Sequence, residues 1–458
     1  MTGIDDAWAA LGGDPASSPR LTAVAREGAL DARLPVRELA RACVGVCALA
    51  AAELAARRYG LPEAPAVRVD DGAVAASFHS ERVLRVDGRA PLLFAPLSRF
   101  WRTADGWVRT HANYPHHRAR LLGALGLPDG ASADDLAGRL AGCRALEAEE
   151  AVHRAGGLAV AVRTPDQWRA HPQAAEVVAR PLVERERLDT APARVLPRPD
   201  SAAPSLLPAA GLRVLDLTRV LAGPVATRVL ALLGADVLRL DAPRLPELPD
   251  QHADTGFGKR SATLDLAADR DAFDALLRMA DVVVTGYRPG ALDRFGLAPR
   301  ALAERRPGLV VAQVSAWGAY GPWGGRRGFD SLVQAATGIA VAEGSAERPG
   351  ALPAQALDHG TGHLLAAGVL RALTEQTYDG GSRLVRTALA RTAHWLTTGI
   401  RPAPAEGAPY TGPDAWVAET DSSLGRLRHA RPAVSFAGGP TAWTRPPGPW
   451  GTDPARWR

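Results

Sequence analysis

The sequence predicts an α/β protein with a doubly wound parallel sheet and a smaller α+β domain beside it. In the second half of the chain, short segments rich in Val and Leu alternate with longer helical segments. These short segments are apolar throughout, which is typical of parallel strands that helices cover on both faces. The length of 458 residues allows two or three structural units, each with its own core.

The first half of the chain has a different texture. Residues 35–58 predict an amphipathic to apolar helix, and residues 66–113 are predicted to form short strands joined by the turns DDG, DGR and ADG. Three helical regions are expected after these strands, at 116–126, 132–155 and 165–181. A Pro-rich stretch at 192–211 resists helix or central strand, so we place the main boundary there.

The repeated pattern of the second half begins directly after that stretch. Residues 213–217 form a strand, 222–235 a helix that opens near Pro224, and 236–243 a second strand, which makes a β-α-β unit. The pattern continues with a strand at 261–266, a helix at 269–280 capped by Asp269 or Asp271, a strand at 281–287, and a helix followed by a strand over 300–318.

Ligands of such sheets bind at the carboxyl ends of the strands. The loops at those ends should therefore gather on one edge, and they cover residues 217–224, 240–244, 285–296 and 315–323. None of the four contains GxGxxG or GxxxxGKS/T, which disfavours NAD and ATP as the principal ligand.

These patterns divide the chain into three regions. Residues 1–205 form a small-domain-like α+β region with helices, and residues 206–400 form the doubly wound half. Residues 401–458 are rich in Pro, Gly and Trp and predict a tail that wraps over another part of the molecule.

Composition excludes several classes of partner and site. The net charge is +5, but Arg residues are spread along the chain among Asp and Glu, which argues against nucleic acid and leaves an anionic small ligand open. Three cysteines are too few for a disulfide framework, and no Cys/His cluster has metal-ligand spacing, so we expect no metal. The apolar run at 43–56 is interrupted by Glu53 and short for a bilayer, so we expect a cytoplasmic protein without a membrane segment.

An acid stands among glycines where an apolar helix begins, in ALDHGTGHLLAAGVLRAL at 356–373. Asp358 could simply cap that helix, and it could equally be a nucleophile that the helix dipole keeps ionised. His359 and His363 are i, i+4 neighbours without a third ligand, so we interpret them as packing groups or hydrogen-bonding partners. His111, His116 and His117 are expected at the surface.

Three segments in order resemble the family III CoA-transferases of the CaiB/BaiF superfamily: 211–241, 280–297 and 321–340. The resemblance is close over 209–400 and implies a Rossmann-like fold for this half. Residues 100–190 and the end of the tail resemble parts of the family as well. In the family the small domain follows the Rossmann-like half, whereas here it comes first, so the segment order looks rearranged.

The resemblance implies a function and its residues. Asp358 would be the nucleophile of a CoA-transferase, and the amides near Gly360 and Gly362 would face a developing oxyanion, with His359 in support. The CoA-binding residues are expected to be Tyr287, Arg288, Pro289, Gly290, Arg294, Lys259 and Arg327, and the substrate contacts Leu221, Ala222, Asp330 and Gln334. Leu221 stands where formyl-CoA transferases carry Gln, which favours a less polar acyl group.

The implied reaction moves CoA between an acyl-CoA and a small carboxylic acid, through an aspartyl anhydride and an aspartyl-CoA thioester, with CoA thioester as substrate and no permanently bound cofactor. The implied assembly is an interlocked homodimer. An α-methylacyl-CoA racemase is the first alternative, although Phe329 occupies the position of the usual His base. An inactive CoA-binding homologue is the second.

Overall fold

The computed structural model describes residues 3–196, 198–200, 203–404 and 406–458. Parts of the predicted Pro-rich connection, residues 197 and 201–202, lie outside this range. The centre of the molecule is a seven-stranded sheet in the order β10-β9-β8-β11-β12-β13-β7. Its strands are β7 (Glu184–Arg187), β8 (Arg213–Leu217), β9 (Asp236–Asp241), β10 (Arg260–Thr263), β11 (Val282–Thr285), β12 (Val310–Ser315) and β13 (Arg383–Ala388).

The sheet confirms the predicted doubly wound α/β fold. β8 to β13 are parallel, and the strand order reverses between β8 and β11, where such sheets bind their ligands. β7 pairs antiparallel with β13 at the edge. Because β7 precedes the other six strands in the sequence, the predicted boundary at residue 205 does not separate the large sheet from the region before it.

Two helical layers cover the sheet. Alternate strand residues divide between two cores: Val282 and Val284 face α2 (Val36–Tyr59), α10 (Ala222–Leu232) and α16 (Ala356–Asp379), whereas Val283 faces the other side. That other side carries α12 (Arg270–Met279) and α13 (Pro299–Arg305). Asp269 is the residue before α12, but its side chain makes no cap hydrogen bond to that helix.

The predicted region 1–205 is built as separate parts. Its first part packs on the helices of the large sheet, and consists of α1 (Gly3–Ala10), η1 (Pro15–Arg20), β1 (Leu21–Val24), α2, β2 (Val67–Asp70), α3 (Asp71–Phe78), α4 (Ser80–Val83) and β3 (Arg85–Val86). The stretch DDG starts α3 instead of making a strand turn, because the Asp70 side chain accepts from the Gly72 amide and caps a helix.

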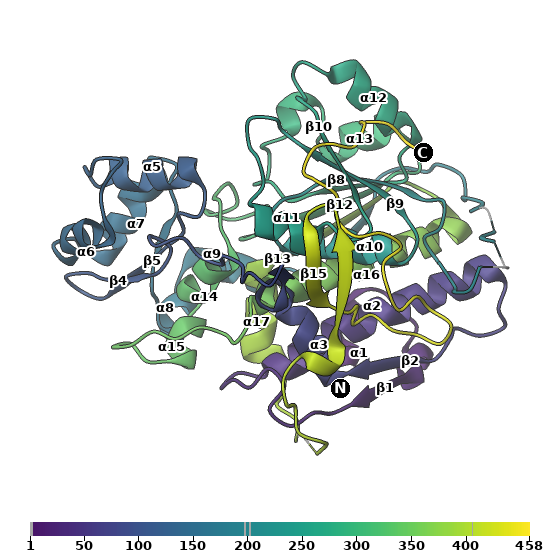
Figure 1. Cartoon of the computed structure of the whole chain (residues 1–458), viewed down its shortest axis with the longest axis horizontal. Coiled ribbons are helices and arrows are strands. Elements are labelled where there is room, and N and C mark those ends of the chain that lie inside the picture. The colour runs from purple at the N-terminus through teal and green to yellow at the C-terminus, as the bar shows by residue number, and fades with distance from the viewer. Residues whose placement is uncertain (1–2, 197, 201–202, 405) are drawn as a thin grey trace.

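The second part forms a lobe with its own core, at the left of Figure 1. It contains β4 (Phe100–Arg102), β5 (Trp107–Thr110), α5 (Pro115–Ala124), α6 (Ala133–Ala141), α7 (Ala145–Arg154) and β6 (Ala159–Ala161). We call it the small lobe. α8 (Pro165–Arg169) and α9 (Pro172–Val178) lead from it to β7. The predicted helices at 132–155 and 165–181 are each interrupted by a short turn.

The helix α2 is long and apolar enough to cross a membrane by length and composition, contrary to the expectation that its apolar run is too short. Of its most apolar window, 83% is buried inside the molecule. It packs along α16, and Glu53 pairs there with Arg371. This degree of burial is typical of a core helix.

The C-terminal segment runs over the outside of the large sheet's helices and strands, as the yellow ribbon in Figure 1 shows. It contains η4 (Asp414–Trp416), β14 (Val417–Ser422) and β15 (Gly425–Ala430). The two strands form a small sheet with β3. Farther on, the Trp450 indole donates to Asp241 at 2.9 Å and the Trp457 indole to the Leu276 carbonyl at 2.9 Å. The loops of the large sheet also contain α11 (Pro249–Thr255), η2 (Asp293–Phe295), α14 (Asp330–Ala336) and α15 (Ile339–Glu343). α17 (Leu389–His394) and the π-type turn η3 (Trp395–Gly399) follow β13.

The close approach of α10 and α16 makes a testable demand on Gly362. A β-carbon at this position would lie 2.4 Å from the Ala222 carbonyl oxygen, which is backbone and cannot swing away. We expect Gly362→Ala to lower the free energy of unfolding by about 1–3 kcal/mol, the usual cost of overpacking. Gly138→Ala is the control, because nothing lies within 4 Å of its added carbon on α6, and it should stabilise by roughly 0.5–1 kcal/mol. Denaturant unfolding of both variants checks this, and equal effects would contradict it.

Candidate active site

Asp358 and Asp330 meet at the start of α16. One carboxylate oxygen of Asp330 accepts from the backbone amides of Leu357 and Asp358, at 2.9 and 3.1 Å. Its other oxygen accepts from the Gln334 side-chain amide. The residue before α16, Gln355, supplies no side-chain cap. Asp330 therefore does the capping from another helix, since the first amides of a helix have no partner within it.

This arrangement buries two carboxylates side by side. Asp330 is 1% exposed and Asp358 is 5% exposed. Burial and the charges of Asp330 and Glu81 raise the pKa of Asp358 well above its usual value. Burial raises the pKa of Asp330 to about 6 despite its hydrogen bonds. No described residue donates to the Asp358 carboxylate, whereas Asp330 accepts three hydrogen bonds, so the proton that the pair retains belongs on Asp358.

The N-terminal part of the chain completes the surroundings of Asp358. His359 is fully buried, its Nε2 lies 3.1 Å from the Glu81 carboxylate, and its ring stacks on Phe78 at 5.1 Å. Burial alone would raise the pKa of Glu81, but the hydrogen bond and charge of His359 outweigh it and lower that pKa. Glu81 was missed in the sequence, because its segment was interpreted as strands.

The glycines after Asp358 serve close packing. α16 begins at Ala356, so Gly360 and Gly362 lie beyond its open first turn, where their amides belong to the helix. A β-carbon on Gly360 would lie 3.3 Å from the Cys43 sulfur of α2. This position disfavours the predicted oxyanion role of these amides, and it explains the glycines by the approach of α2 and α10.

The loop after β8 carries backbone strain. Val220 has φ of 68°, in the left-handed region that a β-branched residue rarely adopts. Its amide donates to the buried Glu247 carboxylate at 3.0 Å, which holds the loop in place. Leu221 is 1% exposed and Ala222 begins α10 against Gly362, so both predicted substrate residues pack beside the start of α16.

The loop after β11 and the segment before α14 bring arginines together without acids. Arg288 and Arg327 are exposed, and within the described ranges no carboxylate pairs with either. Partial burial, together with the charges of Arg288 and Arg120, lowers the pKa of Arg327. The predicted CoA-binding arginines at these two positions therefore lie near each other. Arg120 of the small lobe joins them and was missed, because its α5 segment is distant in sequence.

Other predicted CoA-binding residues lie along the same loop. Gly290 has φ of 77° and turns the chain after Pro289. Tyr287 is half-buried, and burial raises its pKa. Arg294 is exposed, with its guanidinium 4.7 Å from the Phe295 ring centroid.

The prediction for Lys259 is wrong. Its ammonium is buried inside the molecule, 3.0 Å from Asp216, 2.6 Å from the Thr227 hydroxyl and 2.9 Å from the Pro224 carbonyl. Burial lowers the pKa of Lys259 to about 8, against the effect of Asp216. The side chain ties the sheet to the start of α10 and is closed to a phosphate.

Two predicted substrate contacts are also internal. The Asp330 oxygens accept hydrogen bonds from two α16 amides and from the Gln334 side chain. The Gln334 side-chain carbonyl accepts from the Leu352 amide at 2.9 Å. These residues hold the site rather than line it. The expectation of surface histidines fails for His111 and His117, which are 4% and 6% exposed and pack on Phe329.

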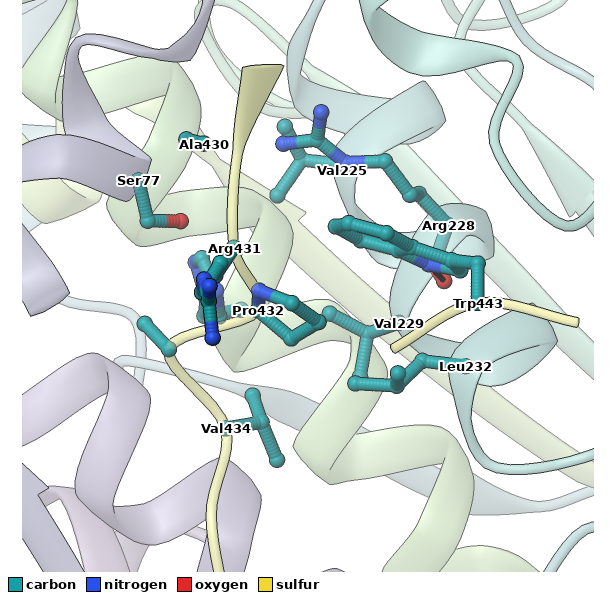
Figure 2. A pocket seen from close by; sticks show the side chains of 12 residues that line it. Ser77, Val225, Arg228, Val229, Leu232, Ala430, Arg431, Pro432, Val434 and Trp443 are labelled. Carbon is teal, nitrogen blue, oxygen red and sulfur yellow. Dashed lines mark hydrogen bonds between the residues drawn. The ribbon is translucent and has the colours of Figure 1, made fainter. Parts of the chain in front are cut away.

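A cavity behind α16 does not mark a cofactor site. Its lining includes His363, Arg228 and Trp443, and Figure 2 shows Arg228 and Trp443 side by side on its wall. Its volume of about 10 Å³ holds one water molecule at most. Arg120, Arg288 and Arg327 do not belong to its lining.

Comparisons with known proteins agree with the motifs. Residues 209–407 match the model of CoA-transferase family III. A probable fatty acyl-CoA transferase of Mycobacterium tuberculosis is 36% identical over 199 residues, which are 40% of this chain and 50% of that protein. A formyl-CoA:oxalate CoA-transferase of Streptomyces coelicolor is 36% identical over 193 residues, which are 39% of this chain and 47% of the relative.

A solved structure of a CaiB/BaiF family protein from Brucella suis is 26% identical, covers 48% of this chain and 65% of its own, and has a TM-score of 0.38. The chain spans about half the length of the curated relatives it matches. The resemblance to family III that the sequence indicated is confirmed over residues 209–407.

The internal position of Lys259 can be tested by stability. Lys259→Met leaves Asp216 buried without its cation, so we expect a loss of roughly 3–5 kcal/mol in the free energy of unfolding. Arg294→Met, at an exposed position, should change it by less than about 0.5 kcal/mol. Denaturant titrations measure both. Unchanged stability of Lys259→Met with weakened CoA binding would restore the role predicted from the sequence.

Proposed function

We propose that this chain, whose residues 209–407 match CoA-transferase family III, transfers CoA from an acyl-CoA to a carboxylic acid with Asp358 as the nucleophile. The observation that carries the proposal is the buried carboxylate of Asp358 at the start of α16, free of hydrogen-bond donors from the described residues and paired with Asp330. The names of the relatives, which are acyl-CoA and formyl-CoA transferases, support the same reaction class.

The reaction proceeds by successive acyl exchanges between CoA and Asp358. The ionised Asp358 carboxylate attacks the thioester carbonyl, the C–S bond breaks, and CoA thiolate leaves behind a mixed anhydride. The thiolate then attacks the Asp358 carbonyl of the anhydride, which releases the first acid and leaves an aspartyl-CoA thioester. The carboxylate of the second acid attacks that thioester, which releases CoA thiolate and forms a second mixed anhydride. The thiolate then attacks the acyl carbonyl of this anhydride, which gives the new acyl-CoA and frees the Asp358 carboxylate.

The surrounding residues have separate tasks. Asp330 fixes the backbone of Asp358, and His359 with Glu81 anchors the next residue of α16. Arg288, Arg327 and Arg120 bind the phosphates of CoA, for which the guanidinium fork is suited. Leu221 and Ala222 line the acyl group. Asp358 must release its proton before it attacks, so the raised pKa sets a pH requirement for the first step.

We further propose that the protein acts in the cytoplasm as an interlocked homodimer that binds neither nucleic acid nor membrane, which the family resemblance supports. The racemase alternative needs a second base at the position of Phe329, whose ring cannot accept a proton. The alternative of an inactive CoA-binding homologue is separated from both by the covalent intermediate.

Intact mass spectrometry tests the nucleophile. We expect the wild-type chain, incubated with a panel of acyl-CoAs, to gain the mass of CoA less water, and to lose it on treatment with hydroxylamine. Asp358→Asn should give no adduct, whereas Asp166→Asn, at an exposed site on α8, should behave as wild type. CoA binding without an adduct would overturn the transferase proposal, and exchange of the α-proton for deuterium would then distinguish the racemase from an inactive homologue.

The carboxylate pair predicts a pH effect. The single-turnover rate of adduct formation should rise with pH through the pKa of Asp358, because only the ionised form attacks. Asp330→Asn keeps an oxygen to accept from the α16 amides and removes the negative charge, so the midpoint should move about one pH unit or more lower. Rate measurements across pH decide this, with Asp166→Asn as control. An unchanged or higher midpoint would refute the coupling of the pair.

The same pair has a stability consequence with a fixed sign. A carboxyl whose pKa is raised on folding stabilises the folded chain fully below its unfolded pKa, and this contribution is lost as pH rises through the folded value. Asp358→Asn should therefore be more stable than wild type at neutral pH, and this advantage should shrink as pH falls towards the ordinary Asp range. Melting temperatures across pH measure it, and a destabilised variant at neutral pH would contradict the raised pKa.

A further inference from the structure

Arg109 is a buried cation without an acidic partner. It lies on β5 of the small lobe and is 8% exposed. Its Nε is buried with no hydrogen-bond acceptor, and no carboxylate within the described part of the chain forms an ion pair with it. The guanidinium instead lies over the rings of Phe94 and Phe100, 5.2 and 5.0 Å from their centroids. Burial of a charge costs free energy unless an oppositely charged or hydrogen-bonding group compensates it.

His111 extends the same face. Residues two apart on an extended chain point the same way, and His111 follows Arg109 by two. It is 4% exposed, and both of its ring nitrogens are buried without a partner. Its ring stacks on Phe329 with centroids 3.8 Å apart, and its edge meets Phe94. Thr110, between them, points the other way and bonds to the core of the small lobe.

This face adjoins the carboxylate pair. α14 begins at Asp330, directly after Phe329, and packs against β5. Burial lowers the pKa of Arg109 to about 10, and the charge of Asp330 acts against that shift, so the two groups interact. The pKa of Asp358 responds instead to Asp330 and Glu81. Arg109 is therefore affected by Asp330 and is not among the groups that shift the pKa of Asp358.

The chemistry of the two side chains fits one class of ligand. A guanidinium presents parallel N–H donors that match a carboxylate. Burial and the charge of Arg109 lower the pKa of His111 to about 3, so near pH 7 its ring is neutral and offers one N–H donor. The rings of Phe94, Phe100 and Phe329 flank these donors and suit a methylene chain.

We propose that Arg109 and His111 bind a second carboxylate of the acid substrate, so that the transferred acyl group is that of a dicarboxylic acid. One carboxylate reacts at Asp358, and the other pairs with Arg109 between the aromatic rings. This assignment rests on the proposed transferase function.

The experiment compares acids of equal length as acceptors. The aspartyl-CoA form of the enzyme is presented with glutarate or valerate, and the acyl-CoA product is followed. We expect wild type to prefer glutarate, and Arg109→Met to reduce kcat/KM for glutarate about 10- to 100-fold through KM, the range for a lost hydrogen-bonded charge. The kcat/KM for valerate should change less than about threefold in Arg109→Met. Arg109→Lys should recover part of the loss, and Arg102→Met, on the exposed side of β4, should match wild type.

Two readouts keep the proposals distinguishable. Adduct formation on Asp358 tests the transferase function alone. Calorimetric binding of glutarate to wild type and Arg109→Met tests the subsite without turnover. If adducts form but both acids respond equally to Arg109→Met, or if glutarate binds both proteins equally, the subsite is refuted and Arg109 serves only as a counter-charge to Asp330. If adducts fail while glutarate binding depends on Arg109, the subsite stands without the reaction.

Discussion

The capping of α16 by Asp330 is the constraint on which the site depends. A helix start buried inside a protein needs acceptors for its amides, and here a carboxylate from α14 supplies them. The bond fixes Asp358 in position, but it also places a second acid beside it in a region with little water. The same contact that positions Asp358 makes it unfavourable for both carboxyls to be ionised at once. The pair therefore retains a proton.

Burial of α16 is completed by chain segments that lie far away in sequence. α2 packs along it near Gly360, and the segment of α3 and α4 delivers Phe78 and Glu81 to His359. β7, which also precedes β8 in the sequence, pairs with β13 and forms one edge of the large sheet. Elements that precede β8 in the sequence therefore enter the core of the large sheet, and the chain does not divide at residue 205 into two independent units.

The sequence predicted the parts of this structure that depend on local periodicity. Strands β8 to β12 and helix α2 follow from runs of apolar residues, and the gathering of loops at one edge follows from parallel order alone. Asp358 was selected as a candidate because it opens an apolar helix, and the structure places it at the start of α16. Glu81 and Arg120 were missed because their roles depend on pairings between distant segments, and DDG was misread because a turn and a helix cap use the same residues. Lys259 was wrongly predicted to bind CoA for a related reason, because the sequence does not show whether a charged side chain is buried.

Depth and partners together separate the cations of this molecule. Arg288, Arg327 and Arg120 keep contact with solvent, so an incoming phosphate replaces water at little cost in desolvation. Lys259 and Arg109 are both buried, at 3% and 8% exposed, yet Lys259 has a carboxylate, a hydroxyl and a carbonyl as partners, whereas Arg109 has aromatic rings. A buried charge with a full set of partners stabilises the fold, and adding a ligand there would break bonds. A buried charge without them leaves its hydrogen-bond donors unused, and an anion that supplies acceptors gains what the folded chain did not provide. The contrast between these two buried side chains, Lys259 directly before β10 of the large sheet and Arg109 on β5 of the small lobe, is the physical reason to assign one to structure and the other to a ligand.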